Sequence, residues 1–199
     1  MDKVNINDVA EIYCGDCLEV LRGFPDQSIQ CCVTSPPYWG LRDYKVDGQI
    51  GVEKCLFEYI TNIVCIFREV RRVLREDGTL WIVLGDSYVS STKKKTNNAY
   101  GLKPKDMAGV PWRVAFALQD DGWYLRRDII WSKPKVMPES VRDRCTISHE
   151  YIFHLSKSSK YYYDSDAVKE PCRSGLSDIK KMLQKKIALE ASIKCLMTS

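Results

Sequence analysis

Residues 29–40 read IQCCVTSPPYWG, and the fold that we expect for this chain follows from them. Ile29–Thr34 is a nearly continuous apolar run, which is typical of a parallel β-strand buried on both faces of a sheet. The strand is expected to stop at Ser35-Pro36-Pro37, because proline lacks the backbone N–H that a β-ladder needs. Open α/β sheets bind ligands at the carboxyl ends of their strands, so the corner after Thr34 is the candidate site.

Strand and helix patterns alternate on both sides of this stretch. The expected elements are a strand over 11–15, helices over about 17–22 and 54–75, a buried strand over 79–84, a helix over about 106–119, and strands over 123–131 and 149–155. Asp16 is suited to cap the first helix, and Asp77-Gly78 is expected to end the second. The order predicts an α/β fold whose sheet is mostly parallel, with the last two strands forming an antiparallel pair.

The composition is that of a folded globular domain. The chain has 199 residues and a formal net charge of +4, and 45% of its residues are hydrophobic. Its longest apolar runs, such as Leu80–Leu84, are too short to cross a bilayer, and the N-terminus lacks the apolar core of a secretory signal. We therefore expect a cytoplasmic protein with no membrane partner.

The chain contains nine cysteines, an odd number that favours a reducing compartment over a disulfide framework. Cys14-Gly-Asp-Cys17 has the spacing of a metal or redox pair, but no second CxxC motif and no Cys/His pair at the spacing of zinc ligands accompanies it. We therefore expect no metal, and we interpret these residues as core cysteines at the end of a strand.

Cationic residues concentrate between Lys93 and Arg144, where 12 lysines and arginines accompany 6 acidic residues. The aromatic residues among them are Trp112, Trp123, Tyr124 and Trp131. Two interpretations stay open. The segment forms either a surface that binds nucleic acid through phosphate contacts and base stacking, or a solvated basic face whose aromatic side chains belong to the core.

The corner after Thr34 combines hydrogen-bond acceptors with aromatic faces. Its two prolines fix the backbone and present carbonyl oxygens without competing N–H donors. A planar ring that carries an amino group would fit here, stacked on Tyr38, with its N–H groups donating to Ser35 Oγ and to the Pro36 carbonyl oxygen. The sequence therefore predicts a pocket for a planar ring that carries an amino group.

Ser35-Pro36-Pro37-Tyr38 after an apolar strand resembles the catalytic motif of amino-group DNA methyltransferases, particularly those that modify cytosine N4. Further segments resemble, in order, the permuted β-type members: CGDCLEVL at 14–21, DGTLWIVLGDSY at 77–88, PWRVAFALQDDGWYLRRDIIWSKP at 111–134 and SHEYIFHLSKSSKYYYD at 148–164. The resemblance implies a partial Rossmann-like methyltransferase fold that uses S-adenosyl-L-methionine. It also implies methyl transfer to a base flipped out of double-stranded DNA.

The resemblance implies roles for particular residues. The expected catalytic residues are Ser35, Pro36, Pro37 and Tyr38, the expected cofactor-binding residues are Asp16 and Thr34, and the expected contacts to base or DNA are Trp39, Arg42, Trp131 and Lys133. Other roles stay open, because Asp16 also suits a helix cap, Trp131 a core position, and Arg42 an ion pair with Asp43. A serine at the first motif position favours cytosine N4, with adenine N6 as the alternative target.

The chain departs from the permuted members in its glycines. They carry a Gly-x-Gly cofactor-binding turn downstream, whereas no two of the eleven glycines here have that spacing. We expect an incomplete catalytic region over 1–170, an unpaired edge beside Ile29–Thr34, and over 171–199 an atypical tail with an amphipathic helix.

Three interpretations stay open. The chain is a methyltransferase whose missing strand comes from a second copy, a complementing chain or an unusual C-terminus, or it is a truncated, inactive DNA-binding remnant. In the third, it is a DNA-binding or assembly subunit that pairs through its C-terminal helix. The resemblance also implies a possible restriction endonuclease as a partner. Binding of S-adenosyl-L-methionine and methylation of DNA are the properties that separate the first interpretation from the others.

Overall fold

The computed structural model describes residues 2–6, 9–89 and 101–170. Its elements, in chain order, are β1 (Asp2–Ile6), β2 (Ala10–Cys14), α1 (Cys17–Arg22), β3 (Ile29–Thr34), α2 (Leu56–Val73), β4 (Leu74–Leu84), α3 (Val110–Asp120), β5 (Tyr124–Ser132) and β6 (His149–Ser156). None of the helices in these ranges has the length and apolar character needed to cross a bilayer. The tail helix expected within 171–199 lies outside the described residues.

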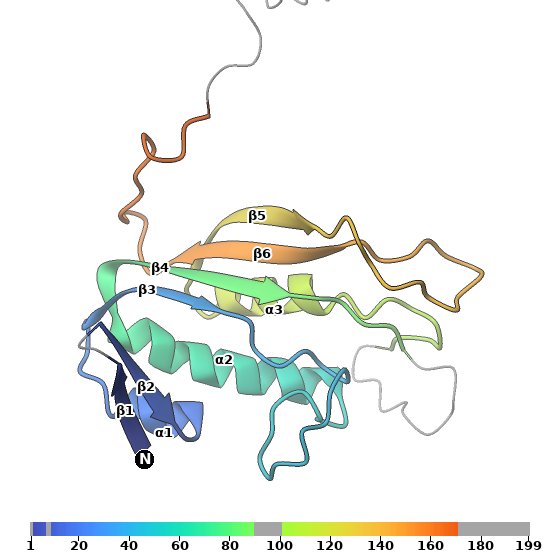
Figure 1. The fold of residues 1–199 in the computed structure, drawn as a ribbon, viewed down its shortest axis with the longest axis horizontal. Helices are drawn as coiled ribbons and strands as arrows, with labels where there is room; N and C mark the ends of the chain where they lie inside the picture. Colours follow the sequence, from blue (N-terminus) through green and yellow to red (C-terminus); the bar gives the residue numbers. More distant parts are fainter. Residues whose placement is uncertain (1, 7–8, 90–100, 171–199) are drawn as a thin grey trace, which may run out of the picture. The chain divides into compact units, whose positions relative to one another are not determined.

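Four strands form one sheet in the order β3-β4-β6-β5. β3 pairs with β4 in parallel, whereas β4 and β5 each pair with β6 antiparallel. β3, β4 and β5 therefore run in one direction and β6 runs against them, as Figure 1 shows. The predicted α/β class and the antiparallel β5–β6 pair are confirmed. The sheet was also predicted to be mostly parallel, and three of its four strands do run in the same direction. In the described part of the chain only β3 and β4 are adjacent parallel strands, because the antiparallel β6 lies between β4 and β5.

Helices α2 and α3 lie on the same side of this sheet (Figure 1). Side chains alternate between the two faces of a strand, and the inward residues of β4 show this pattern. Leu80 and Leu84 are 0% exposed and Ile82 is 1% exposed. α2 contributes an apolar stripe to the same core, made by Leu56, Tyr59, Ile60, Ile63, Phe67, Val70 and Val73.

The prediction that β3 is buried on both faces is wrong. Val33 is 72% exposed, and β3 is the edge strand of the sheet in the described residues. Its apolar sequence has cover on the side of α2 only, since no described helix packs on the other side. The predicted open edge beside β3 is therefore present in this part of the chain.

The prediction that Asp77-Gly78 ends the second helix is also wrong. α2 ends at Val73, where Leu74 turns extended with ψ 140°, and Asp77 and Gly78 both lie inside β4. The glycine is needed for a close approach of strands, because a Cβ at Gly78 would lie 2.9 Å from the Arg75 carbonyl oxygen and 3.2 Å from that of Gln30.

The prediction of core cysteines at the first strand end is wrong, since Cys14 and Cys17 are exposed. The reason is that β2 pairs only with β1, antiparallel, in a separate two-stranded sheet of the described residues. Cys32 on β3 is half-buried, and burial raises the pKa of its thiol to about 11. The seven cysteines in the described ranges are all free thiols.

The chain divides into two compact units, residues 1–162 and 163–199. All helices and strands given above lie in the first unit. The sequence-based boundary near residue 170 stays a prediction, and the sites described below belong to the first unit.

Candidate functional site

The carboxyl end of β3 leads into a corner that the helical layer holds in place. Thr34, the last residue of β3, is half-buried and pairs in register with Ile82 of β4. Ser35 and Pro37 are exposed and Pro36 is half-buried. The hydroxyl of Tyr59, a residue that is 0% exposed on α2, donates to the Pro37 carbonyl oxygen at 2.9 Å. Burial raises the pKa of Tyr59, which keeps this donor protonated.

A chain of hydrogen bonds starts at the exposed hydroxyl of this corner. Ser35 Oγ donates to the Tyr38 hydroxyl at 3.3 Å, and that hydroxyl donates to Glu150 Oε2 at 3.2 Å. Glu150 also forms an ion pair with Lys133 through its other oxygen. Burial, followed by the proximity of the Glu150 carboxylate, raises the pKa of Tyr38, so the phenol stays a donor at neutral pH.

Gly85, the residue after β4, makes room for the Tyr38 ring. A Cβ atom at this position would lie 2.8 Å from Tyr38 Cε2 and 3.1 Å from Cδ2. Only a residue without a side chain lets the ring lie against the backbone here, and φ at this glycine is not in the left-handed region. Gly85 therefore sets the position of Tyr38.

The structure brings two of the predicted DNA-contacting residues to the same corner. Trp131 on β5 pairs in register with Glu150 on β6 and is 50% exposed. Lys133 follows β5, and its Nζ lies 5.5 Å from the centroid of the Trp131 ring. Trp131 is thus an exposed strand residue rather than a core residue, and it stands beside the hydrogen-bonded chain.

Other predicted site residues take no part in the hydrogen bonds that link Ser35, Tyr38 and Glu150. Trp39 is half-buried against the core and donates through Nε1 to the Glu53 carbonyl oxygen at 3.1 Å. Arg42 is exposed on the following loop, and the suggested ion pair with Asp43 is not formed among the described residues. Asp43 Oδ1 instead accepts from the Lys45 amide at 2.8 Å.

Asp16 serves as the cap of α1, as the sequence allowed. Its Oδ1 accepts from the amides of Leu18 at 2.9 Å and Glu19 at 3.2 Å. These bonds satisfy two of the free N–H groups at the start of the helix. The cap uses one carboxylate oxygen, and the side chain is exposed.

Sequence reasoning missed Glu150, Gly85 and Asp86. Asp86 Oδ1 accepts from the amides of Ser87 at 2.8 Å and Val110 at 3.0 Å, so it links the end of β4 to the start of α3. Burial raises the pKa of Asp86, although the amide donors act in the opposite direction. An acidic residue beside glycine after a buried strand was the available signal. Glu150 had none, because its role depends on strand register.

The aromatic residues of the basic segment 93–144 support both interpretations in part, because some belong to the core and others lie at the surface. Trp112 packs against Phe153 with ring centroids 5.1 Å apart, and Trp123 is 2% exposed, so both belong to the core. Tyr124 is 46% exposed and, like Trp131, stands at the surface. Several of the cations form ion pairs, for example Lys105 with Asp143 at 2.6 Å.

The sheet order and the corner at its carboxyl edge define a Rossmann-like methyltransferase fold, and solved structures agree. The PvuII DNA methyltransferase, named as cytosine-N4-specific, superposes with a TM-score of 0.59 at 22% identity, over 85% of this chain and 61% of that one. TTHA0409 of Thermus thermophilus, crystallised with S-adenosyl-L-methionine, superposes with a TM-score of 0.54 at 25% identity, over 83% and 60%.

The sequence comparisons identify the family. The N6/N4 family model described as DNA methylase matches residues 29–186, so the chain belongs to this family. Type II methyltransferase M.Cfr9I of Citrobacter freundii is 54% identical over 181 residues, which cover 83% of this chain and 60% of the relative. M.SmaI of Serratia marcescens is 54% identical over 185 residues, covering 85% and 63%. The chain thus spans about 60% of the length of these relatives.

Proposed function

We propose that this protein transfers a methyl group from S-adenosyl-L-methionine to the exocyclic N4 of cytosine in double-stranded DNA, with the target base flipped out of the duplex. The observation that carries the proposal is the hydrogen-bond chain from Ser35 through Tyr38 to Glu150. Family membership and the match to Type II methyltransferases support it.

The direction of these hydrogen bonds determines whether Ser35 Oγ can donate to a substrate or accept from it. A hydroxyl has one proton and two lone pairs, and the Ser35 proton is directed to Tyr38, whose own proton is directed to Glu150. Ser35 Oγ is therefore left as an acceptor, which suits an amino group. Accepting from that group favours its pyramidal form and stabilises the positive charge that develops on nitrogen.

The aromatic side chains at the corner suit an unstacked base. Extrusion of a base costs on the order of a few kcal/mol, and stacking on an aromatic ring returns about 1–3 kcal/mol. Tyr38 and the half-exposed Trp131 are the rings available for this contact. Pro36 would add its carbonyl oxygen as a second acceptor, and Pro37 is held by Tyr59.

The described residues fit part of the cofactor. When bound, S-adenosyl-L-methionine supplies a methyl group activated by positively charged sulfur. Asp16 uses Oδ1 for the cap, so Oδ2 would accept from the adenine amino group, and Thr34 would contact the cofactor at the carboxyl end of β3. A Gly-x-Gly turn, which these 199 residues do not contain, would hold the remainder.

Methylation of DNA by purified protein tests the proposal. The chain is incubated with S-adenosyl-L-methionine and unmethylated bacterial genomic DNA, and the nucleosides are analysed by mass spectrometry. We expect N4-methylcytosine. Ser35→Ala should reduce turnover by about 10²–10³-fold with a smaller effect on DNA affinity. Ser28→Ala is the matched control, because Ser28 is an exposed serine before β3 whose hydroxyl donates to the Pro25 carbonyl oxygen. Equal activity of Ser35→Ala and the control would contradict the assignment.

Two alternatives have distinct results in the same experiment. N6-methyladenine as the product would identify adenine as the target. A second result would be that the protein binds DNA but does not methylate it, and that titration with millimolar S-adenosyl-L-methionine releases no heat. This result would favour a DNA-binding role, with methyl transfer requiring a second copy or a complementing chain. The open β3 edge is the observation that favours this second alternative. A restriction endonuclease as a functional partner is proposed from the Type II relatives alone.

A further inference from the structure

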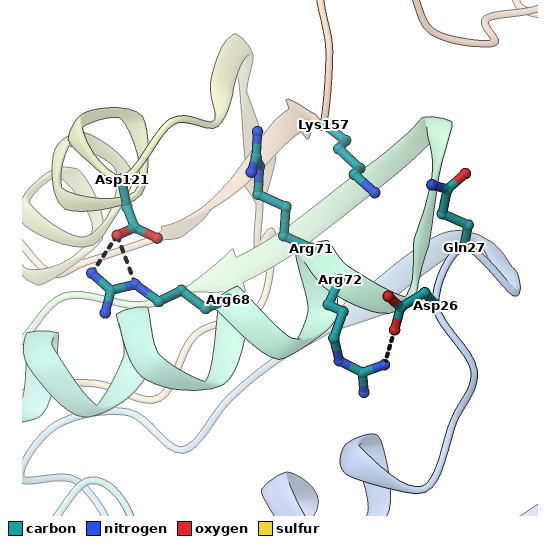
Figure 2. Close-up of a pocket in the computed structure, with 7 residues that line it drawn as sticks. All are labelled: Asp26, Gln27, Arg68, Arg71, Arg72, Asp121 and Lys157. Carbon is teal, nitrogen blue, oxygen red and sulfur yellow. Dashed lines mark hydrogen bonds and ion pairs between the residues drawn. The ribbon is translucent and has the colours of Figure 1, made fainter.

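A cavity with a volume of about 450 Å³ lies among cationic side chains at the other end of the sheet. Its lining includes four cations, Arg68, Arg71, Arg72 and Lys157, and two carboxylates, Asp26 and Asp121 (Figure 2). β4 starts beside this cavity at Leu74 and has 11 residues, which span about 33 Å before the strand ends at the Tyr38 corner. The cavity is therefore separate from the proposed methyl-transfer site.

Two of the cations are held in place by carboxylate partners. Arg68 pairs with Asp121 at 2.6 Å, and Arg72 pairs with Asp26 at 2.5 Å and with Glu69 at 2.9 Å. These pairs connect α2 to the end of α3 and to the segment after α1. They give the cavity walls that are already ordered before any ligand binds.

Lys157 is fixed in a different way. Its Nζ donates to the Leu74 carbonyl oxygen at 2.8 Å and lies 3.0 Å from Glu76, a carboxylate that is 66% exposed. An ammonium group has three N–H donors, so one is left for a ligand. Water screens the exposed carboxylate, which leaves much of the charge of Lys157 effective within the cavity.

Arg71 differs from the other three cations. Its Nε is buried and has no hydrogen-bond partner among the described residues. Figure 2 shows its guanidinium group between Asp121 and Lys157 with no bond drawn to either. Because Nε itself is closed off, a ligand in the cavity would meet the terminal nitrogens of the guanidinium, a planar group that matches the oxygens of a phosphate in a bidentate arrangement.

We propose that this cavity binds a phosphate group, with Arg71 and Lys157 as its main contacts. The C-terminal end of α2 lies nearby. It carries the equivalent of about half a negative charge, which disfavours a bound anion. Arg71, which has no ion-pair partner in the described ranges, together with the remaining donor of Lys157, outweighs this effect. The phosphate comes either from free phosphate in solution or from the backbone of bound DNA.

Nuclear magnetic resonance on the full chain tests this site. The Nε–H signals of arginine are followed while inorganic phosphate is added at constant ionic strength, with chloride as the balancing anion. We expect a saturable shift of the Arg71 signal. Arg71→Gln should weaken phosphate binding by about tenfold. Arg75→Gln, which removes an exposed arginine that pairs with Asp77 outside the cavity, should change it by less than about twofold.

The other outcomes are equally specific. An Arg71 signal that does not move with phosphate in the wild-type protein, or that moves equally with chloride, would overturn the proposal and leave the cavity as an ion-pair network. Repetition with saturating duplex DNA identifies the source. Loss of the phosphate response would place a backbone phosphate in the cavity, whereas an unchanged response would assign it to free phosphate. The readout does not require methyl transfer, so it is independent of the proposed function.

Discussion

The two faces of the central sheet differ in how completely they are covered. On the face that meets α2 and α3, Ile82 and Phe153 are each 1% exposed. On the other face, Val33 is 72% exposed and Trp131 is 50% exposed, and no described helix covers it. Burial of apolar area is the main stabilising contribution in folding. Most of the stability therefore comes from the covered face, while the open face and its carboxyl edge are left for other contacts.

Truncation of a residue in the core should change stability more than any other substitution proposed here, and it tests the difference between the two faces. Phe153→Ala should lower the free energy of unfolding by about 3–5 kcal/mol, because it removes a fully buried ring and leaves a cavity. Val33→Ala on the open face should cost less than about 0.5 kcal/mol. Urea unfolding followed by circular dichroism measures both. Similar losses for the two variants would show that the open face is covered in solution.

Addition of a methyl group at Gly85 should give the next largest effect. The new Cβ would lie 2.8 Å from the Tyr38 ring, so Gly85→Ala should cost about 1–3 kcal/mol of stability and move the ring. In a Tyr38→Ala background the ring is absent, so adding Gly85→Ala should cost much less stability than Gly85→Ala costs in the wild-type protein. Urea titration of the wild type, the two single variants and the double variant measures this difference. Additive losses would mean that Gly85 acts elsewhere.

Removal of the Tyr59 hydroxyl tests how the covered layer holds the corner. Tyr59→Phe should destabilise the protein by about 1 kcal/mol, because the Pro37 carbonyl oxygen loses its 2.9 Å donor. Hydrogen exchange at the amides of Tyr38 and Trp39 should become faster, while exchange in the middle of α2 stays nearly unchanged. Uniform acceleration throughout the domain would instead indicate a general loss of packing.

The pH dependence of stability probes His154, which shares the face of Val33 and Trp81 but lies where the rings of Trp81 and Tyr161 pack against it. His154 is 4% exposed and stacks on Trp81 with ring centroids 4.1 Å apart. Burial, followed by the charge of Arg126, lowers the pKa of His154 below its ordinary 6.5. As pH falls below 6.5, the unfolded state takes up a proton that the folded state does not, so stability should decrease. His154→Gln should flatten this slope between about pH 7 and 5, as measured by urea midpoints.

Local signals in the sequence predicted the segments that lead to the site. The apolar run and the two prolines correctly set the limits of β3 at Ile29 and Thr34, and Asp16 was correctly suited to cap α1. The local signals failed at Asp77-Gly78. The glycine there was interpreted as the end of a helix, whereas it lies in β4 and allows close approach to the backbone of β3. A short pattern reports the backbone geometry that a segment prefers but not which neighbour it will meet.

The α/β class, the resemblance to amino-group DNA methyltransferases and the position of the Ser35–Tyr38 corner could all be read from the sequence, because each depends on residues that are close together in the chain. Tertiary structure alone decided that Tyr38 bonds to Glu150, a residue 112 positions away. It also decided that one face of the sheet is covered, and that Arg71 and Lys157 line the same cavity. Such contacts follow from strand register and helix packing, which many distant residues set together.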